Sequence, residues 1–194
     1  MTTQIKPRLT AAEYLAGERE AETKSEFFNG EMFAMAGANR RHNLIVTNIV
    51  REVSARLRDR PCDIYANDMR VKVSPTGLYT YPDVVIACDD IQFEDDHEDT
   101  LLTPIVLIEV LSKSTQGYDR FQKFAHYRRL STLREYLLVA QDQPRVEHYV
   151  RQSEKQWLLS ESAEYSDVVA MASIGCGLSI KDIYEKVDLK SPSP

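Results

Sequence analysis

Two acidic residues lie inside runs of apolar residues, where an unpaired charge is costly. Asp83 lies in the run 81–87 (YPDVVIA), and Glu109 lies in the run 104–111 (PIVLIEVL). An ionised carboxylate in a low-dielectric interior must be protonated, paired with a cation or used to hold a metal ion. Both acids therefore need a chemical explanation.

Each of the two runs has the composition of a buried β-strand that is entered through a proline, which cannot donate to a strand ladder. Because side chains alternate across a strand, Asp83 shares a face with Val85, and Glu109 shares a face with Leu107. If the strands are neighbours, the carboxylates converge, and hard oxygen ligands of this kind suit Mg²⁺ or Mn²⁺. The alternative is structural, with each acid paired to a buried Arg or Lys or bound to nearby backbone.

The first part of the chain predicts two helices and a hairpin. Thr10 can cap a short helix from Ala11 to about Gly17. The dipeptide Asn29-Gly30 between two apolar segments is a strong hairpin signal. Apolar residues at helical spacing then predict a long helix over residues 42–57.

Strands predominate after this helix, and further helices are expected between Ser112 and Glu135 and from Ser179 to about Val187. A turn is expected at 175–177. The order predicts an α/β (mixed α+β) fold with a sheet at its centre, one domain over residues 1–190 and a disordered tail at 191–194. The runs that predict strands are 63–73, 79–87, 105–111, 135–140, 146–151, 156–160 and 168–172.

The charge of the chain bears on its partners. The formal net charge is −6, which weakens a broad electrostatic grip on nucleic acid, because that grip depends on Lys and Arg. Much of the excess is local, since seven of the eleven residues 89–99 are Asp or Glu. This acidic segment could repel a phosphate backbone, bind a basic partner or simply be solvated.

The cysteines and the ends of the chain bear on its compartment. Cys62, Cys88 and Cys176 are odd in number and widely spaced, so we expect three reduced thiols. The first nine residues lack the apolar core of a signal peptide, and no stretch approaches the length of a membrane span. We expect a cytoplasmic protein with no membrane partner.

Several motifs together resemble one known family. The PD and E-x-x signals at Asp83 and Glu109 resemble the PD-(D/E)XK nuclease superfamily. More narrowly, the chain resembles the Uma-two family of restriction-endonuclease-like proteins. The matching segments are EFFNGE at 26–31, His42, YPDV at 81–84, EVLSKST at 109–115, Tyr118-Asp119, Lys123 with Tyr127, and Glu135-Tyr136.

This resemblance implies a restriction-endonuclease-like core, in which a central mixed sheet is flanked by helices and preceded by the hairpin. It also implies hydrolysis of phosphodiester bonds with Mg²⁺ or Mn²⁺ as cofactor, nucleic acid (DNA above RNA) as substrate, and a homodimer. By position, Asp83 and Glu109 are the expected metal ligands, and Glu26 is the additional acid that completes the metal shell.

The sequence departs from the superfamily pattern where a lysine should follow Glu109 by two residues, because that position is Leu111. The resemblance points to Lys123 as the catalytic cation. Asp119, Lys123 and Tyr127 lie at i, i+4 and i+8 of the predicted helix, so they share one face. Lys113 is the rival, since strand alternation puts it on the face of Glu109.

His42 matches a family position at the start of the long helix, and we expect it to be an auxiliary residue. The other function class that the sequence leaves open is a catalytically silent, nuclease-fold binding or assembly module. Its support is the acidic segment 89–99, which would serve as an interaction loop.

Overall fold

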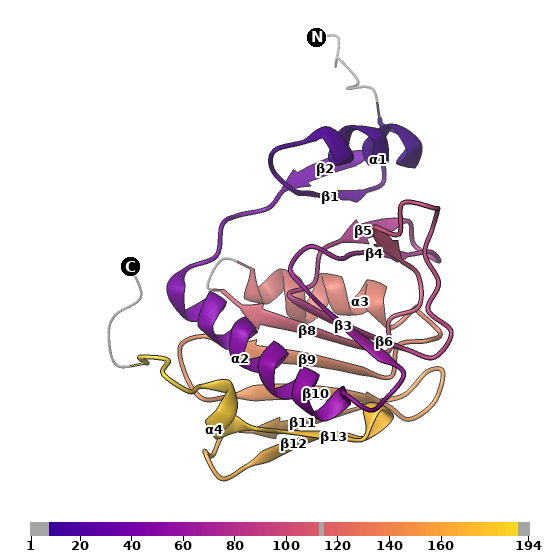
Figure 1. Cartoon of the computed structure of the whole chain (residues 1–194). Coiled ribbons are helices and arrows are strands. Elements are labelled where there is room, and N and C mark those ends of the chain that lie inside the picture. Colours follow the sequence, from indigo (N-terminus) through magenta and orange to yellow (C-terminus); the bar gives the residue numbers. More distant parts are fainter. Residues whose placement is uncertain (1–7, 113–114, 190–194) are drawn as a thin grey trace.

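Two β-sheets organise the chain in the computed structural model, which describes residues 8–112 and 115–189 (Figure 1). Buried apolar side chains from both sheets pack in one core. The strands are β1 (Ser25–Phe28), β2 (Glu31–Ala34), β3 (Cys62–Ala66), β4 (Arg70–Val73), β5 (Leu78–Thr80), β6 (Val84–Cys88), β7 (Thr100–Leu101), β8 (Val106–Leu111), β9 (Glu135–Ala140), β10 (Val146–Arg151), β11 (Trp157–Ser162), β12 (Val168–Met171) and β13 (Cys176–Ser179).

The larger sheet has six strands in the order β11-β10-β9-β8-β6-β3. It is mixed, because β8 and β9 run parallel while the other neighbours run antiparallel. A five-stranded sheet has the order β2-β1-β5-β4-β7, and β12 pairs with β13. The predicted mixed α/β fold with an N-terminal hairpin is confirmed, although the hairpin belongs to the five-stranded sheet rather than the central one.

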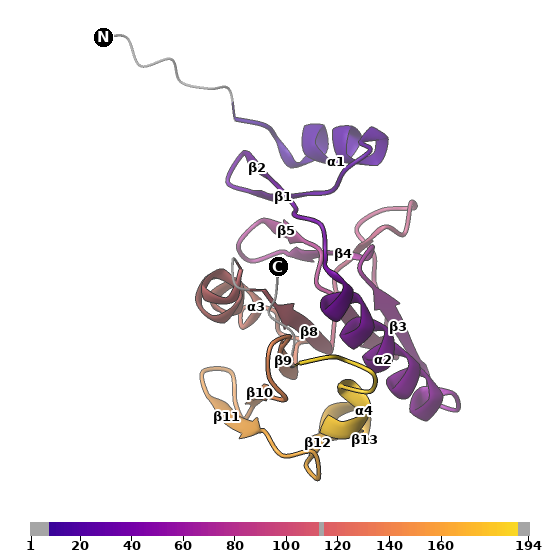
Figure 2. The same ribbon diagram turned by 90° about the vertical axis from the view of Figure 1, so that its left-hand side faces the viewer.

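Helices cover both faces of the six-stranded sheet. Helix α2 (Arg40–Leu57) and α4 (Ile180–Ile183) lie on one face, and a π-helix (Tyr118–Lys123) that continues into α3 (Phe124–Tyr127) lies on the other (Figure 2). Helix α1 (Ala11–Glu20) packs on the hairpin. Within the described residues, no helix is long and apolar enough to span a membrane.

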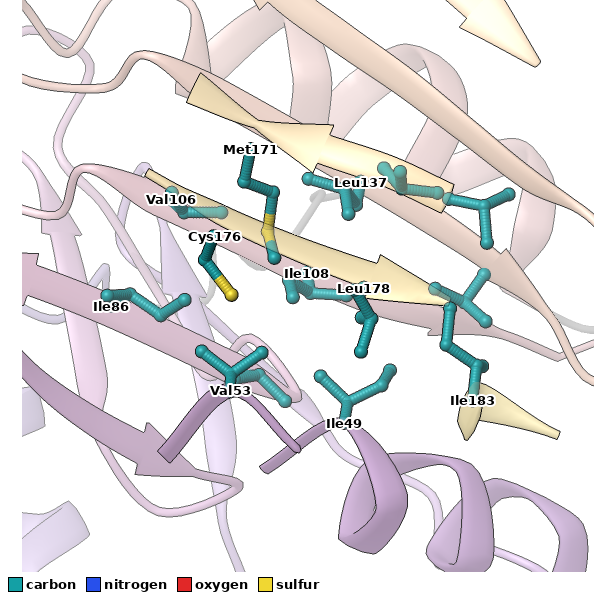
Figure 3. Packing of buried hydrophobic residues seen from close by; sticks show 14 of the residues in the cluster. Ile49, Val53, Ile86, Val106, Ile108, Leu137, Met171, Cys176, Leu178 and Ile183 are labelled. Carbon is teal, nitrogen blue, oxygen red and sulfur yellow. The ribbon is translucent and has the colours of Figure 1, made fainter. Parts of the chain in front are cut away.

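Strand alternation divides the apolar side chains between two cores. On one face, Ile49 and Val53 of α2 meet Ile86, Ile108 and Leu178 (Figure 3). The alternate side chains of each strand point to the opposite face, where they pack against the π-helix, α3 and the five-stranded sheet. The buried residues of this second core include Val71, Leu78, Val85, Leu107, Leu111, Tyr127, Leu130, Leu133 and Tyr136.

Two long strands that the sequence predicts are each divided between the two sheets. The predicted strand 63–73 breaks at Asn67, whose φ of 59° is a left-handed conformation that Asn tolerates. The predicted strand 79–87 breaks at residues 81–83, so Asp83 precedes β6 and does not lie within a strand. The backbone amide of Asn67 donates to the Asp83 carbonyl oxygen at 3.0 Å. The two segments that pass from one sheet to the other are thus hydrogen-bonded to each other.

Other boundaries also differ from the sequence-based expectations. Helix α1 runs through Gly17 to Glu20, and α2 begins at Arg40 because Asn39 caps it. In the tail, Gly175 makes the turn with a φ of 55°, but Cys176 already starts β13. The last helix is a single turn rather than a helix to Val187. The predicted tail 191–194 lies outside the described residues.

The expectation of three reduced cysteines is wrong for two of them. Cys62 and Cys88 are directly opposite each other on antiparallel β3 and β6, and they form a disulfide. Their separation of 26 residues gave no hint of this register. Cys176 is a buried free thiol, as expected.

Candidate active site

Strand register brings Asp83 and Glu109 together. Val84 pairs with Ile108 on antiparallel β6 and β8, so Asp83, one residue before β6, lies beside the position of Glu109. The backbone amide of Val110 donates to Asp83 Oδ2 at 2.7 Å. Strand alternation puts Glu109 on the face of the second core with Leu107 and Leu111, whereas Asp83 lies just before β6 and contacts His42 of α2.

Lys123 reaches this face from the last residue of the π-helix. Its Nζ lies 3.1 Å from Glu109 Oε1, 3.1 Å from Glu26 Oε1 and 3.4 Å from Asp119 Oδ1. The side chain is buried, so its contact with Asp119 is not the exposed helix pair of a surface. Short π-helices occur often at functional sites, and here one places a lysine against β8 and the hairpin strand β1.

Glu26 belongs to β1 and is buried, unlike a solvated hairpin acid. Besides Lys123, its carboxylate accepts a hydrogen bond from the Thr80 hydroxyl and another from the Tyr118 hydroxyl at 3.1 Å. Sequence reasoning gave neither of these two residues a role. The available signals were a threonine at the end of an apolar strand and a tyrosine next to Asp119.

Tyr127, from α3, donates its hydroxyl to Glu109 Oε1 at 2.8 Å. The ring is fully buried beside Tyr136, with the ring centroids 5.3 Å apart. Tyr127 is therefore both a packing residue and a polar partner of Glu109.

His42 contacts the other acid. Its Nε2 lies 3.1 Å from Asp83 Oδ1. Asn39 Oδ1 accepts the backbone amide of His42 at 3.0 Å, which fixes the first turn of α2 and so the place of the imidazole. His42 Nδ1 is buried without a hydrogen-bond partner among the described residues.

The site holds more acids than cations. Burial raises the pKa of the Glu109 carboxyl well above its usual range, an effect that Lys123 opposes and that Asp119 and Asp83 increase. Burial also raises the pKa of Asp119, again against Lys123. For Lys123, burial disfavours the charge, but Glu109, Glu26 and Asp119 outweigh it and hold the pKa well above the usual range. The ammonium is therefore charged at neutral pH.

The excess of carboxyl groups over cations fits an additional cation, whose charge would favour the ionised carboxylates, and the donor set also suits one. Mg²⁺ commonly binds one or two carboxylates and keeps several waters, and Asp83 and Glu109 offer two. The third expected ligand, Glu26, points its Oε1 at Lys123. In the described part of the chain, no group of three His, Cys, Asp or Glu side chains is arranged to hold a metal ion.

The structure gathers Glu26, Glu109, Asp119, Lys123 and Tyr127 into one buried network and links Asp83 to His42 beside it. These seven residues come from the hairpin, α2, the residue before β6, β8, the π-helix and α3. The rival lysine, Lys113, lies outside the described residues.

Part of the acidic segment pairs with basic side chains elsewhere in the protein. Asp95 and Asp99 each lie 2.8 Å from Arg19 of α1, and Glu94 pairs with Lys72 of β4. These internal partners neutralise part of the negative charge that weighed against nucleic acid binding.

A surface groove lies apart from this site. It has a volume of about 580 Å³ and is lined by Cys88, Ile105, Arg129 and Arg134, among others. Cys88 ends β6 and Ile105 precedes β8, so the groove lies at the other end of the strands from Asp83 and Glu109.

Comparison with known proteins gives one family match, over residues 11–181, to Uma2, described as "Putative restriction endonuclease". Two proteins of Synechocystis sp. (strain ATCC 27184 / PCC 6803 / Kazusa) are similar along most of their length. Uncharacterized protein sll1609 is 42% identical over 160 residues, which is 82% of this chain and 89% of that protein. Uncharacterized protein slr1290 is 32% identical over 179 residues, which is 92% of each.

A solved structure shares the fold. The crystal structure of a protein described as a putative nuclease belonging to DUF820, from Anabaena variabilis ATCC 29413, matches with a TM-score of 0.74. The match covers 91% of this chain and 97% of that chain, at 21% sequence identity. The mixed sheet flanked by helices is thus a fold that this chain shares with that protein.

Proposed function

The chain belongs to the Uma2 family of restriction-endonuclease-like proteins, and from this premise we propose that it is a metal-dependent endonuclease that hydrolyses phosphodiester bonds of DNA. The observation that carries the proposal is the register of β6 and β8, which sets Asp83 beside Glu109, together with the ammonium of Lys123 3.1 Å from Glu109 Oε1.

Asp83 and Glu109 are the residues that would hold Mg²⁺ or Mn²⁺. A divalent cation at that position supplies polarisation of a phosphoryl oxygen and an acidified water as nucleophile. The Val110 amide and His42 fix the orientation of the Asp83 carboxylate. This orientation supports the metal role, because the partners of ligating carboxylates set their geometry.

Lys123 supplies the cation that the usual superfamily position lacks. Its ammonium offsets the negative charge that develops on the phosphate during hydrolysis and helps to orient the attacking water. Glu26 and Asp119 hold the ammonium from two further sides, at 3.1 and 3.4 Å. Hydrolysis by an activated water needs no covalent intermediate with the protein.

The test is cleavage of plasmid DNA and of labelled single strands, branched DNA and RNA with Mg²⁺, with Mn²⁺ and with chelator. We expect cleavage that depends on the metal and that Asp83→Asn and Glu109→Gln each reduce at least about 10²-fold. Asp68→Asn is a matched control, because Asp68 is an exposed acid paired with Lys24 outside the site. Equal activity in all variants, or activity in chelator, would contradict the proposal.

We further propose a homodimer, which would present two sites to the two strands of a duplex. Strand β2 is a free edge of the five-stranded sheet, and all of its residues are exposed, including Met32 and Phe33. Edge strands of this kind readily pair with another chain. Light scattering of the wild type and of Phe33→Glu tests the assembly, and a monomeric wild type would exclude it. A cytoplasmic location remains a prediction of the sequence.

A further inference from the structure

Lys123 is held by three carboxylates in the manner of a bound cation. Glu26, Glu109 and Asp119 each present an oxygen to its Nζ within 3.4 Å. Glu109 Oε1 accepts a hydrogen bond from the ammonium, and Glu26 and Asp119 lie within ion-pair distance of it. All four side chains are at least nine-tenths buried, which leaves water little part in the arrangement.

One oxygen of Glu109 is central to this arrangement. Oε1 accepts both from Lys123 at 3.1 Å and from the Tyr127 hydroxyl at 2.8 Å. Glu109 is also one of the two acids that would hold the divalent cation. The Lys123 ammonium and the divalent cation would therefore both bind the Glu109 carboxylate.

We propose that Lys123 occupies the cation position of the metal-free site, and that a divalent cation bound by Asp83 and Glu109 must compete with its ammonium for Glu109. This inference rests on the proposed metal-dependent function. Lys123 does not have to leave the network, because Glu26 and Asp119 still hold it when Glu109 turns to the metal.

Electrostatic repulsion determines whether the charge of Lys123 strengthens or weakens metal binding. Two cations within a few ångströms of each other repel strongly when little water screens them. The lysine thus keeps the excess of buried acids partly neutralised before the metal arrives and weakens metal binding by its charge. Removing the charge should make the metal bind more tightly, although the same variant should lose activity.

Calorimetric titration of Mg²⁺ into the full-length protein tests the inference. We expect the Kd of Lys123→Met to fall at least about tenfold below that of the wild type. Lys123→Arg keeps the positive charge and should show no such gain. Lys72→Met is the matched control, because it also removes a lysine from an ion pair, with Glu94, outside the site.

A second measurement uses the wild type and so does not depend on the folding of a variant. Nitrogen NMR of the lysine side chains, with the Lys123 signal assigned from Lys123→Arg, follows the ammonium during a Mg²⁺ titration. The Lys123 Nζ resonance should shift in step with metal binding, while that of Lys72 should stay in place.

The outcomes separate the two proposals. Mg²⁺ binding by the wild type, with no tighter binding by Lys123→Met and a stationary Lys123 resonance, overturns the inference and leaves the proposed function standing. If neither the wild type nor Lys123→Met binds Mg²⁺, both fail. A tighter Lys123→Met together with a metal-dependent Lys123 resonance supports the competition.

Discussion

The backbone amide of Val110 donates a 2.7 Å hydrogen bond to the carboxylate of Asp83. Val110 follows Glu109 on β8, so this bond fixes one proposed metal ligand against the strand that carries the other. The second oxygen of Asp83 faces His42 Nε2 at 3.1 Å. Both oxygens of Asp83 are thus oriented, one by the sheet and one by α2.

His42 should therefore act through Asp83 as a positioning residue. Loss of a hydrogen-bond partner of a metal ligand commonly costs 10- to 100-fold in metal affinity or activity, and we expect a loss of about that size for His42→Ala. The rate as a function of Mg²⁺ concentration is the measurement. A higher metal concentration should restore part of the rate, which a purely structural defect would not allow.

Two further variants serve this experiment. His42→Gln retains an amide that can donate to Asp83 and should recover part of the affinity. His97→Ala changes an exposed histidine of the acidic segment and should match the wild type. Unaltered metal dependence in His42→Ala would rule out the positioning role.

The two candidate lysines make different predictions for catalysis. Lys123→Ala should lower the rate of metal-dependent DNA cleavage at least about 10²-fold, because it removes the cation 3.1 Å from Glu109. Lys113→Ala should stay within about threefold of the wild type if Lys123 is the catalytic lysine. The comparison is made at saturating Mg²⁺ so that metal affinity does not enter. An active Lys123→Ala would point to Lys113 instead.

Local patterns singled out Asp83 and Glu109, whereas the family resemblance pointed to Glu26 and Lys123. Alternation along β8 gives the face of Glu109, and spacing of four residues puts Asp119, Lys123 and Tyr127 on one side of the helix. The signal for Asp83 was its place in an apolar run. These features depend on neighbours in sequence, so the sequence alone carries them.

The missed features depend on contacts between distant segments. The chain changes sheets at Asn67 and again near Asp83, but the alternation of apolar residues is the same in either sheet. Thr80 joins Glu26 across 54 residues, and Cys62 meets Cys88 only through the register of β3 and β6. Nothing local to these residues reports their partners.

The disulfide should stabilise the folded chain measurably. In the chain-entropy model, a disulfide that closes a loop of 26 residues lowers the entropy of the unfolded chain. This raises the free energy of unfolding by about 3 kcal/mol. Dithiothreitol should therefore lower the urea midpoint of the wild type but leave that of a Cys62→Ser/Cys88→Ser double variant unchanged. Thiol titration of the denatured wild type should find one free thiol before reduction and three after. Equal midpoints with and without reductant would argue against the disulfide.

A buried pair outside the site gives a pH-dependent prediction. Glu135 accepts the amide of Ser173 at 2.7 Å and lies 2.5 Å from His148 Nε2. Burial acts to raise the pKa of Glu135, but the hydrogen bonds from His148 and Ser173 outweigh it and lower the pKa below the ordinary value of 4.5. The folded state therefore holds the proton less tightly than the unfolded state does, so the carboxylate stabilises the protein at neutral pH.

This contribution is fully present above about pH 4.5, the pKa of an unperturbed Glu, and is lost as the pH falls through the lowered pKa of the folded state. At pH 7, Glu135→Gln should lower the free energy of unfolding by about 1–3 kcal/mol, because it weakens two hydrogen bonds of a buried charge. At pH 3 the variant and the wild type should lie closer together, as urea unfolding at both pH values would measure. Glu161→Gln, at a half-exposed acid of β11, should change stability by less than about 0.5 kcal/mol at either pH. A difference between Glu135→Gln and the wild type that is as large at pH 3 as at pH 7 would mean that packing, and not the charge of Glu135, accounts for it.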